Sequence, residues 1–452
     1  MAYKNIDDLA TREKTEIDAD GGSFAIRGDI CYCTPAGDFV TAKDGYAVSI
    51  CGVSAGVFAS LPEEYRDIPV EDYSGKLIIP GLVDLHIHAP QFAFRGTEMD
   101  LELMTWLEHK TFPEEARYSD LAYAERAYSV FAEAMRKGAT THALIFATKH
   151  KEATELLMRL MENTGLISYV GKVNMDREAP AALREESAER SAEDTALWIE
   201  AVLGKYKRTY PILTPRFIPC CTHELLEKLR ELQERYGLPV QSHLSENQGE
   251  VDFVRMLCPE SEFYGDAYDN YGLFGSDESA EHRVKTVMAH CVYSTEAEMQ
   301  RIKENGVFVA HCPASNMNLS SGIAPIRKYL SMGLKMGLGS DVAGGHTDSM
   351  LRAVCDAVQV SKLYWRLIDG ESKPLTFKEA FRLATLGGGE FFGKVGSLDP
   401  GYDFSAVVLD DSLLLYPEDA PIEKRLERSA YAALDSYGIK AKYINGRLTY
   451  SN

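Results

Sequence analysis

Eight short apolar runs alternate with longer stretches of helical spacing through the middle of the chain. The stretches between the runs are rich in Glu, Lys, Arg and Ala, and several of them end in Gly, which commonly stops a helix. This alternation predicts an α/β fold in which the runs are buried strands of a (β/α)8 TIM-like barrel, with catalytic groups at their carboxyl ends. A doubly wound open sheet is the structural alternative, weakened because no GxGxxG motif follows the first strand. The strand candidates are KLIIPGLVDLHIH, TTHALIFAT, GLISYVGKVNMD, YPILTPRF, LPVQSHLSE, KTVMAHCV, GVFVAHCP and LKMGLGSDVAGG.

Both ends of the chain carry strand-like runs without long helices between them. SFAIRGDICYC and GYAVSICGVSAGVFAS precede the predicted barrel, and YDFSAVVLD and KAKYINGRLTY follow it. We therefore predict a small β-sandwich domain formed by both chain ends, residues 22–80 and 391–452, with the barrel at residues 81–390 between them. Residues 1–21 are polar and lack strong periodicity, which predicts an N-terminal tail.

Composition excludes several classes of protein. The chain of 452 residues is 45% hydrophobic and 26% charged, which is ordinary for a soluble protein. Its formal net charge of −20 argues against nucleic-acid binding and is compatible with a small, uncharged substrate. No apolar run approaches the roughly 20 residues that span a bilayer, and the N-terminus is polar, so we expect a cytoplasmic protein without a membrane partner. The nine scattered cysteines are interpreted as free thiols.

A pair of histidines follows the first strand candidate, in GLVDLHIHAPQF. A strand places alternate side chains on one face, so His86 and His88 point the same way and together are able to bind one ion. Alone, such a pair is more often two structural histidines. However, His243, His290 and Asp341 lie at or near the ends of the fifth, sixth and eighth strand candidates, and all are residue types that zinc prefers. The coincidence predicts a mononuclear site for a divalent metal at the mouth of the barrel.

Glu246 follows His243 by three residues, just past the fifth strand candidate. A carboxylate beside a metal-bound water is the usual requirement for a proton shuttle. Without the metal cluster, the same residue would be interpreted as an exposed loop acid. With the cluster, Glu246 is predicted to be catalytic.

Several longer motifs resemble the guanine deaminases of the amidohydrolase superfamily. These are PGLVDLHIHAPQFAFRG, TWLEHKTFPEE, TPRF, QSHLSEN, MAHC, HCPASNMNLSSG and GLGSDVAGG, in this order, followed by VGSLDPGYDFSAVVLD. The resemblance covers nearly the whole chain. It implies hydrolytic deamination of guanine to xanthine and ammonia, on one zinc ion per chain, in a homodimer.

The resemblance assigns roles to single residues. Glu246 corresponds to the proton shuttle, and His290 to a histidine that contacts the metal-bound water or lies close to the zinc, so whether it is a formal ligand stays open. Asp341 has a second possible role in moving the proton of the nucleophile. The residues that match the zinc ligands are His86, His88, His243 and Asp341. Those expected to contact the purine are Gln91, Arg216, Phe217 and His243.

Other residues are interpreted as structural. Two-metal amidohydrolases bridge their ions with a modified Lys near the fourth strand, where this chain has TPRF without a lysine, which favours one metal. Lys172 lies on the third strand candidate and is predicted to be structural. Trp106 is predicted to be a core aromatic, and His311 a hydrogen-bonded structural histidine. HCPASNMNLSSG is expected to shape the pocket rim.

Two other functions and two other metals stay open from the sequence. A deaminase of another aminated purine, pterin or triazine would keep the metal residues and change Gln91, Arg216 and Phe217. A non-catalytic assembly protein on the same fold would lose metal ligands or the shuttle. Fe and Mn also accept His and carboxylate ligands, so the identity of the metal is not fixed.

Overall fold

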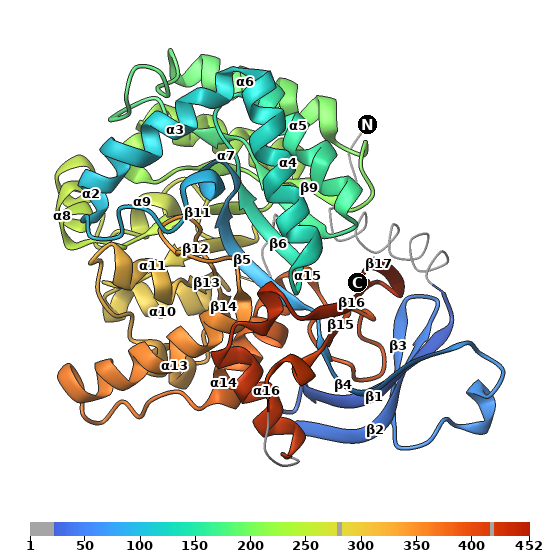
Figure 1. Cartoon of the computed structure of the whole chain (residues 1–452). Helices are drawn as coiled ribbons and strands as arrows, with labels where there is room; N and C mark the ends of the chain where they lie inside the picture. The colour runs from blue at the N-terminus through green and yellow to red at the C-terminus, as the bar shows by residue number, and fades with distance from the viewer. Residues whose placement is uncertain (1–21, 278–282, 416–419) are drawn as a thin grey trace.

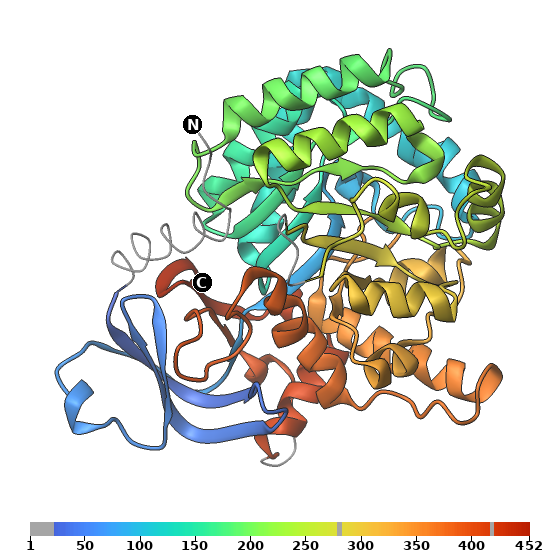
Figure 2. The same ribbon diagram turned by 180° about the vertical axis from the view of Figure 1, so that it is seen from behind.

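A computed structural model of the chain describes residues 22–277, 283–415 and 420–452. The predicted tail, residues 1–21, lies outside the described residues. Helices surround a group of parallel strands, and a sheet built from the two chain ends lies to one side of that group, as Figures 1 and 2 show from opposite directions.

The parallel strands occupy all eight of the predicted strand regions. They form one four-stranded sheet with the order β5-β6-β7-β9, another with the order β11-β12-β13-β14, and a two-stranded piece in which β8 pairs with β10. The α/β class is thereby confirmed. The strands are β5 (Leu82–His88), β6 (Thr140–Phe146), β7 (Ile167–Gly171), β8 (Val173–Asn174), β9 (Thr209–Pro211), β10 (Thr214–Pro215), β11 (Val240–Leu244), β12 (Thr286–His290), β13 (Phe308–His311) and β14 (Met336–Leu338).

Backbone hydrogen bonds link the two four-stranded sheets at both of their edges. Just after β9, the Leu213 carbonyl accepts from the amide of Gln241 on β11 at 2.9 Å. Just after β14, the Asp341 amide donates to the carbonyl of His86 on β5 at 2.8 Å, and the His88 amide donates to the Val342 carbonyl at 3.1 Å. The second link joins two segments that carry predicted metal ligands.

The helices lie between the strands in sequence, as the alternating pattern predicts. The predicted Gly stops are confirmed for α5 and α7, which end at Gly165 (φ 77°) and Gly237 (φ 64°) in the left-handed conformation. No described helix is long and apolar enough to cross a membrane. The helices are α2 (Leu103–Trp106), α3 (Phe112–Ala116), α4 (Leu121–Lys137), α5 (Lys151–Thr164), α6 (Ala188–Val202), α7 (His223–Tyr236), α8 (Gln248–Leu257), α9 (Asp266–Asp269), α10 (Glu296–Glu304), α11 (Pro313–Asn318), α12 (Ile326–Met332), α13 (Met350–Leu367), α14 (Phe377–Arg382), α15 (Gly388–Phe392) and α16 (Ile422–Tyr431).

Shorter helical turns complete the connections. Two of them are π-helical, η3 (Leu107–Thr111) and η6 (Leu383–Gly387). The others are 3₁₀ turns, namely η1 (Glu63–Tyr65), η2 (Ala89–Phe94), η4 (Arg117–Ser119), η5 (Ile218–Cys220), η7 (Asp411–Leu413) and η8 (Leu434–Ser436).

The two chain ends share one seven-stranded sheet with the order β17-β16-β15-β4-β1-β2-β3. Strand β4 is parallel to β1 on one side and antiparallel to β15 on the other, so it joins the N-terminal strands to the C-terminal ones. The strands are β1 (Phe24–Cys33), β2 (Phe39–Ile50), β3 (Val53–Phe58), β4 (Val70–Pro80), β15 (Ala406–Leu409), β16 (Ile439–Ile444) and β17 (Arg447–Ser451).

This sheet is strongly curled. The rings of Phe24 on β1 and Tyr443 on β16 lie 5.2 Å apart, although β4 and β15 separate their strands. In a flat sheet, strands three places apart would be about 14 Å from each other. The curl encloses an apolar cluster that includes Ile30, Ile78 and Phe404. The sequence predicted a β-sandwich for this region, and that prediction stays open, because the described strands form a single sheet.

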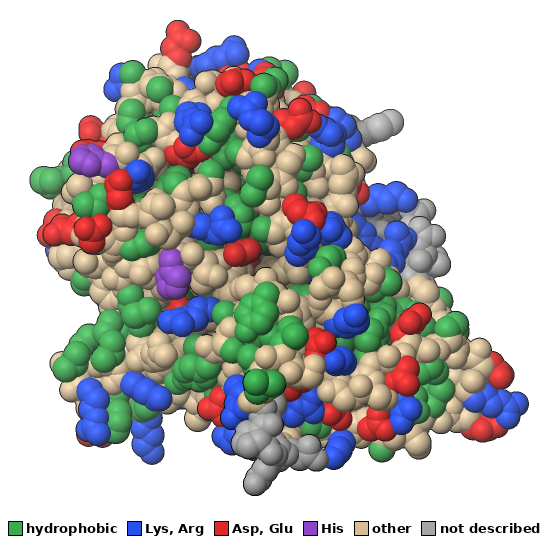
Figure 3. Space-filling model, viewed as in Figure 1, with side chains coloured by type: hydrophobic (Ala, Val, Ile, Leu, Met, Phe, Trp, Pro, Cys, Tyr) green, Lys and Arg blue, Asp and Glu red, His purple; other side chains and the backbone are tan. Residues whose placement is uncertain are grey.

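Surface charge and cysteines accord with the composition. Figure 3 shows acidic and basic side chains interspersed on the face that it draws. All nine cysteines are free, as predicted, and all except Cys51 are buried.

One predicted strand is in fact two strands. The run KLIIPGLVDLHIH ends β4 at Pro80 and begins β5 at Leu82, and the two strands belong to different sheets. Gly81 turns the chain between them, where its amide donates to the Ser405 carbonyl at 2.9 Å. The apolar pattern gave no sign of this break, because both strands are buried at the junction.

Replacing Gly81 with Ala is expected to destabilise the protein. An added Cβ would lie 2.3 Å from Oγ1 of Thr141, a buried residue that cannot move aside freely. Overpacking of this kind costs about 1–3 kcal/mol. Thermal and urea unfolding measure the loss. Gly370→Ala is the matched control, because nothing lies within 4 Å of its added Cβ; equal stability of the two variants would contradict the close packing at Gly81.

Candidate metal and substrate site

Three histidines and one aspartate from three strand ends converge on one point. The Nε2 atom of His88 lies 3.2 Å from Nε2 of His86 and 3.2 Å from Nε2 of His243. Oδ1 of Asp341 lies 3.2 Å from Nε2 of His86 and 3.5 Å from Nε2 of His88. Ligands held at 2.0–2.1 Å around a tetrahedral zinc ion are about 3.3 Å from each other. The four predicted ligands therefore have the spacing of one coordination sphere.

The protonation of this cluster also suits a cation. Nδ1 of His243 lies 2.6 Å from the Arg216 carbonyl, which accepts only, so Nδ1 carries the proton and Nε2 offers a lone pair. Burial lowers the pKa of His86 and lowers that of His88 and His243 strongly, which keeps these imidazoles neutral. Burial alone would raise the pKa of Asp341, but the surrounding imidazoles, His86 first, lower it instead. A divalent metal ion at this point would accept the lone pairs of the neutral nitrogens and balance the charge of the carboxylate.

The first strand presents its two histidines as predicted. Ile87 packs into the main apolar core, while His86 and His88 turn toward the cluster. The pairing of β5 with β6 is irregular between Asp84 and Ile87. Asp84, which sequence reasoning missed, accepts hydrogen bonds from the amides of Ser340 (3.0 Å) and His86 (3.1 Å). Its carboxylate thus ties the strand that carries two ligands to the turn before Asp341.

Several strand ends around the cluster have left-handed backbone that side chains rarely adopt. Ser245, His290 and Asp341 have φ values of 46°, 72° and 45°. Each such residue costs on the order of 1–3 kcal/mol and persists only where its surroundings fix it. Their grouping at this end of the strands is typical of a functional site.

His290 lies beside the four-donor cluster. Its Nε2 is 3.5 Å from Oε2 of Glu246 and 3.8 Å from Oδ2 of Asp341, which are longer than the separations within the cluster. Its Nδ1 lies 2.9 Å from Oδ1 of Asn316. Burial opposes the charged form of His290, but the carboxylates of Glu246 and Asp341 outweigh it and raise the pKa. The ring of His290 therefore lies between the carboxyl groups of Glu246 and Asp341.

Glu246 occupies a buried position over the cluster. The hydroxyl of Ser321 donates to its Oε1 at 3.1 Å, and its backbone amide donates to Oε2 of Glu250 at 3.0 Å. Burial raises the pKa of Glu246 to about 7. A carboxyl group with this pKa exchanges protons readily near neutral pH. Ser321 and the pocket residue Leu319 both belong to HCPASNMNLSSG, so this segment contacts Glu246 and also contributes to the pocket wall.

A pocket opens directly on the cluster. It comprises about 470 Å³ of space free of atoms, part of which is open to solvent. All four residues predicted to contact a purine line it, Gln91, Arg216, Phe217 and His243, together with Glu246. Its apolar wall comes from Leu103, Trp106, Leu107 and Leu319. Trp106 is buried, as predicted for a core aromatic, and also walls the pocket.

Glu115 links two of the pocket residues and was missed by sequence reasoning. Nε2 of Gln91 donates to Oε1 of Glu115 at 3.0 Å, and Nη1 of Arg216 donates to Oε2 at 2.6 Å. Glu115 lies in TFPEE, among the motifs that carry the resemblance. Two adjacent Glu residues after a Pro suggest an exposed helix start, so no local pattern indicates that one of them is buried.

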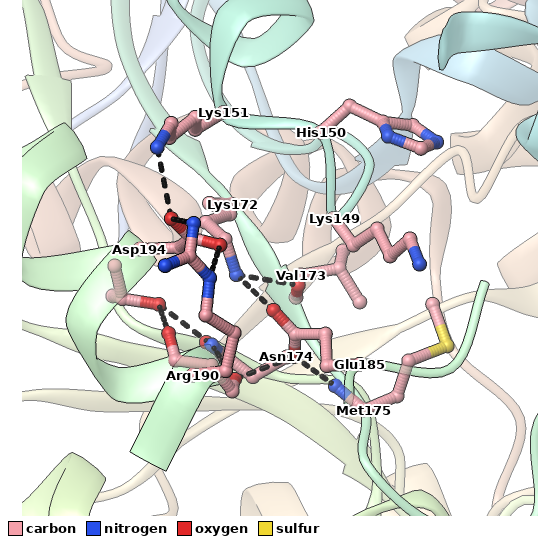
Figure 4. A network of polar contacts seen from close by, with 12 residues as sticks. Lys149, His150, Lys151, Lys172, Val173, Asn174, Met175, Glu185, Arg190 and Asp194 are labelled. Carbon is pink, nitrogen blue, oxygen red and sulfur yellow. Dashed lines mark hydrogen bonds and ion pairs between the residues drawn. The ribbon is translucent and has the colours of Figure 1, made fainter. Parts of the chain in front are cut away.

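Lys172 stands apart from the metal cluster. Its Nζ lies 2.6 Å from Oε1 of Glu185, and both side chains are buried. Glu185 also accepts from the Met175 amide at 3.0 Å and from the Ser191 hydroxyl, in the network that Figure 4 shows. This arrangement accords with the structural role predicted for Lys172.

The prediction for His311 is wrong in one respect. His311 is buried, but neither ring nitrogen has a hydrogen-bond partner among the described residues. Its neighbours Ala310 and Cys312 face a small apolar cluster inside the strands, so His311 projects to the opposite side. Burial lowers its pKa to about 3, which keeps the ring neutral without a partner.

The model of the Amidohydrolase family matches residues 77–449, which is most of the chain. The chain belongs to the amidohydrolase family. Relatives of this amidohydrolase include the guanine deaminase of Dictyostelium discoideum, 38% identical over 385 residues that cover 83% of each protein. The guanine deaminase of Rattus norvegicus is 39% identical over 369 residues, 80% of this chain and 77% of that protein.

A solved structure shares the fold of this amidohydrolase. It is the crystal structure of guanine deaminase from C. acetobutylicum with guanine bound in the active site. The TM-score is 0.90 at 42% identity, and the match covers 95% of this chain and all of that one. The amidohydrolase fold is thereby established for the described residues.

Bound metal tests the four-donor cluster. We expect the purified amidohydrolase to contain about one divalent ion per chain, and we expect His243→Ala to lose this ion. Mutation of a residue that only hydrogen-bonds to a metal ligand typically weakens metal binding by about 10- to 100-fold, and loss of a ligand itself is expected to weaken it more. Elemental analysis after dialysis gives the content. His150→Ala, a half-buried histidine outside the cluster, is the control. If His243→Ala keeps as much metal as the control, the proposed coordination is wrong.

Proposed function

We propose that this amidohydrolase is a guanine deaminase, which hydrolyses guanine to xanthine and ammonia. The observation that carries the proposal is that one pocket joins a four-donor metal cluster, the buried carboxyl of Glu246 and the donor groups of Gln91 and Arg216. The identity of 38–39% to guanine deaminases over most of the chain supports the same activity.

The proposed cofactor is one zinc ion per chain. His86, His88, His243 and Asp341 would hold it, because Nε2 of His88 lies 3.2–3.5 Å from a donor atom of each of the other three, and because the set combines imidazole with carboxylate, which zinc favours. Bound zinc would supply a water whose pKa is lowered to about 7. The placement of Lys172 against Glu185 supports a single ion, since this lysine is not available to bridge a second.

In the proposed mechanism, Glu246 carries protons between water and substrate. It accepts a proton from the attacking water and delivers it to N3 of guanine, which makes C2 electrophilic. The water oxygen then bonds to C2. Glu246 transfers the second proton to the 2-amino group, the C2–N bond breaks, and ammonia leaves with xanthine as the product. His290 and Asp341 orient the attacking water by hydrogen bonds, and Asp341 assists in moving its proton.

Three side chains are proposed to orient the purine. The guanidinium of Arg216 only donates and suits the acceptors O6 and N7, while Gln91 offers both a donor and an acceptor. The ring of Phe217 stacks on the base. His243 lines the same pocket, so it contacts the substrate as well as the metal.

We also propose the domain organisation and assembly that the sequence predicts. The two four-stranded sheets, hydrogen-bonded at both edges, support a (β/α)8 barrel over residues 81–390. The curled sheet supports a composite β-sandwich domain of residues 22–80 and 391–452. A homodimer and a cytoplasmic location belong to the same proposal. Light scattering of the purified protein tests the dimer.

Two other functions have less support. A deaminase of another aminated purine, pterin or triazine would need different contacts from Gln91, Arg216 and Phe217, and these residues suit guanine. A non-catalytic assembly protein has no use for four convergent donors beside a buried acid. Ammonia release from a panel of aminated heterocycles separates these possibilities.

Ammonia release from guanine tests the function and the shuttle together. We expect the wild-type protein to be active and Glu246→Gln to lose about 10²- to 10⁴-fold in kcat, because general acid–base catalysis contributes that much. Metal content is measured in both proteins and is expected to be equal. The control is Asp252→Asn on α8, an exposed acid that bonds to Arg255. A metal-loaded wild-type protein that leaves guanine unchanged, or an active Glu246→Gln, would overturn the proposal.

A further inference from the structure

A buried carboxylate lies directly behind two residues that line the substrate pocket. Glu115 on α3 is 0% exposed, and the side chain of Arg216 is 5% exposed. A charge taken so fully out of water is retained only with a charged or strongly hydrogen-bonding partner. The carboxylate of Glu115 has two such partners, one for each oxygen, in Gln91 and Arg216. Both of these line the pocket, whereas Glu115 lies behind them.

Glu115 fixes which way the amide of Gln91 points. A carboxylate only accepts hydrogen bonds, so the group of Gln91 that faces it is the NH₂. The backbone amide of Ala343 only donates, and it lies 3.2 Å from Oε1 of Gln91. The two contacts demand the same orientation. Gln91 therefore cannot exchange its donor and acceptor positions to suit a different ligand.

Glu115 also keeps Arg216 charged. Burial alone would lower the pKa of Arg216, and the carboxylate of Glu115 more than reverses this, so the pKa is raised. The guanidinium carbon lies 5.2 Å from the centre of the Phe112 ring, on the same helix as Glu115. A guanidinium has several donors and no acceptor, and the bond to Glu115 uses one of them. The rest of the fork presents only N–H groups.

We propose that Glu115 is a positioning residue that makes the pocket select a 6-oxo purine over a 6-amino purine. The inference rests on the proposed function and extends it, because it names the group that sets the specificity. A carbonyl at C6 accepts from the fixed donors of Arg216. An amino group at C6 would place its N–H groups against the N–H groups of Arg216. Buried donors would then have no acceptor, so a 6-amino purine is strongly rejected.

Glu115→Gln is the variant that isolates this role. The new side chain has nearly the same size but no charge, and its amide is able to donate as well as accept. The orientation of Gln91 is then set by the Ala343 amide alone, and the Arg216 fork loses its ion pair. Glu114→Gln is the matched control, since Glu114 is the preceding residue of α3 and bonds to Arg117 and Tyr123.

The experiment compares guanine with 2,6-diaminopurine as substrates of the wild-type and variant holoenzymes, with products separated by chromatography and metal content measured. We expect Glu115→Gln to lose about 100-fold in kcat/KM for guanine, as misplaced substrate-positioning groups typically cause. The loss for 2,6-diaminopurine is expected to be at least about tenfold smaller, so the preference for guanine shrinks. Glu114→Gln is expected to keep both values.

The ratio of kcat/KM for guanine to kcat/KM for 2,6-diaminopurine separates a positioning role of Glu115 from a purely structural one. If both substrates lose equally in Glu115→Gln, Glu115 is only structural and the inference is overturned while the proposed function stands. A wild-type protein inactive on guanine overturns both. If Glu115→Gln does not fold, the double variant Glu115→Gln with Arg216→Gln removes both buried charges. The ratio of its Kd values for the two purines is compared with the same ratio for wild type, and equal ratios would overturn the inference.

Discussion

The convergence of three neutral imidazoles and one carboxylate is the interaction on which the rest of the structure depends. Imidazole lone pairs that face each other at 3.2 Å repel unless a proton or a cation lies between them, so the scaffold must hold them there. Parallel strands do this well, because their carboxyl ends meet at one edge and their buried backbone is fixed by ladder hydrogen bonds. The left-handed φ values of His290 and Asp341 show how firmly the backbone is held.

Behind the metal donors, the site is built from buried acids that each connect separate elements. Asp84 joins β5 to the turn of Asp341, and Glu115 joins Gln91 to Arg216. Each accepts at least two hydrogen bonds, which offsets the cost of burying a carboxylate. Such acids convert the flexible ends of strands and loops into a fixed frame. Orientation of the first layer of side chains therefore depends on residues that never face the pocket.

The predictability of each part follows from its physical origin. The strands were predictable because apolar runs alternate with helical stretches in the sequence. The residues that converge at the strand ends were predictable because His, Glu and Asp directly follow these apolar runs. Gly81 was missed because a break between two buried strands does not interrupt an apolar run. Glu115 and Asp84 were missed because their partners are distant in sequence, and a lone acid has the same pattern whether it is exposed or enclosed. His311 was expected to be hydrogen-bonded because most buried polar groups are, and sequence alone does not mark a buried ring whose nitrogens have no partner among the described residues.

The position of β4 ties the metal site to the order in which the chain is made. Strand β4 runs directly into β5, which carries His86 and His88, and its second neighbour in the sheet is β15, which pairs Pro80 with Ala406. During synthesis β1 is available to pair with β4 early. The other edge of β4 stays open until β15 has been translated, which happens only after the whole barrel region. An open edge of this kind invites pairing with other chains. Completion of the four-donor cluster, which also requires Asp341, and protection of this edge are therefore both late events in the synthesis of the chain.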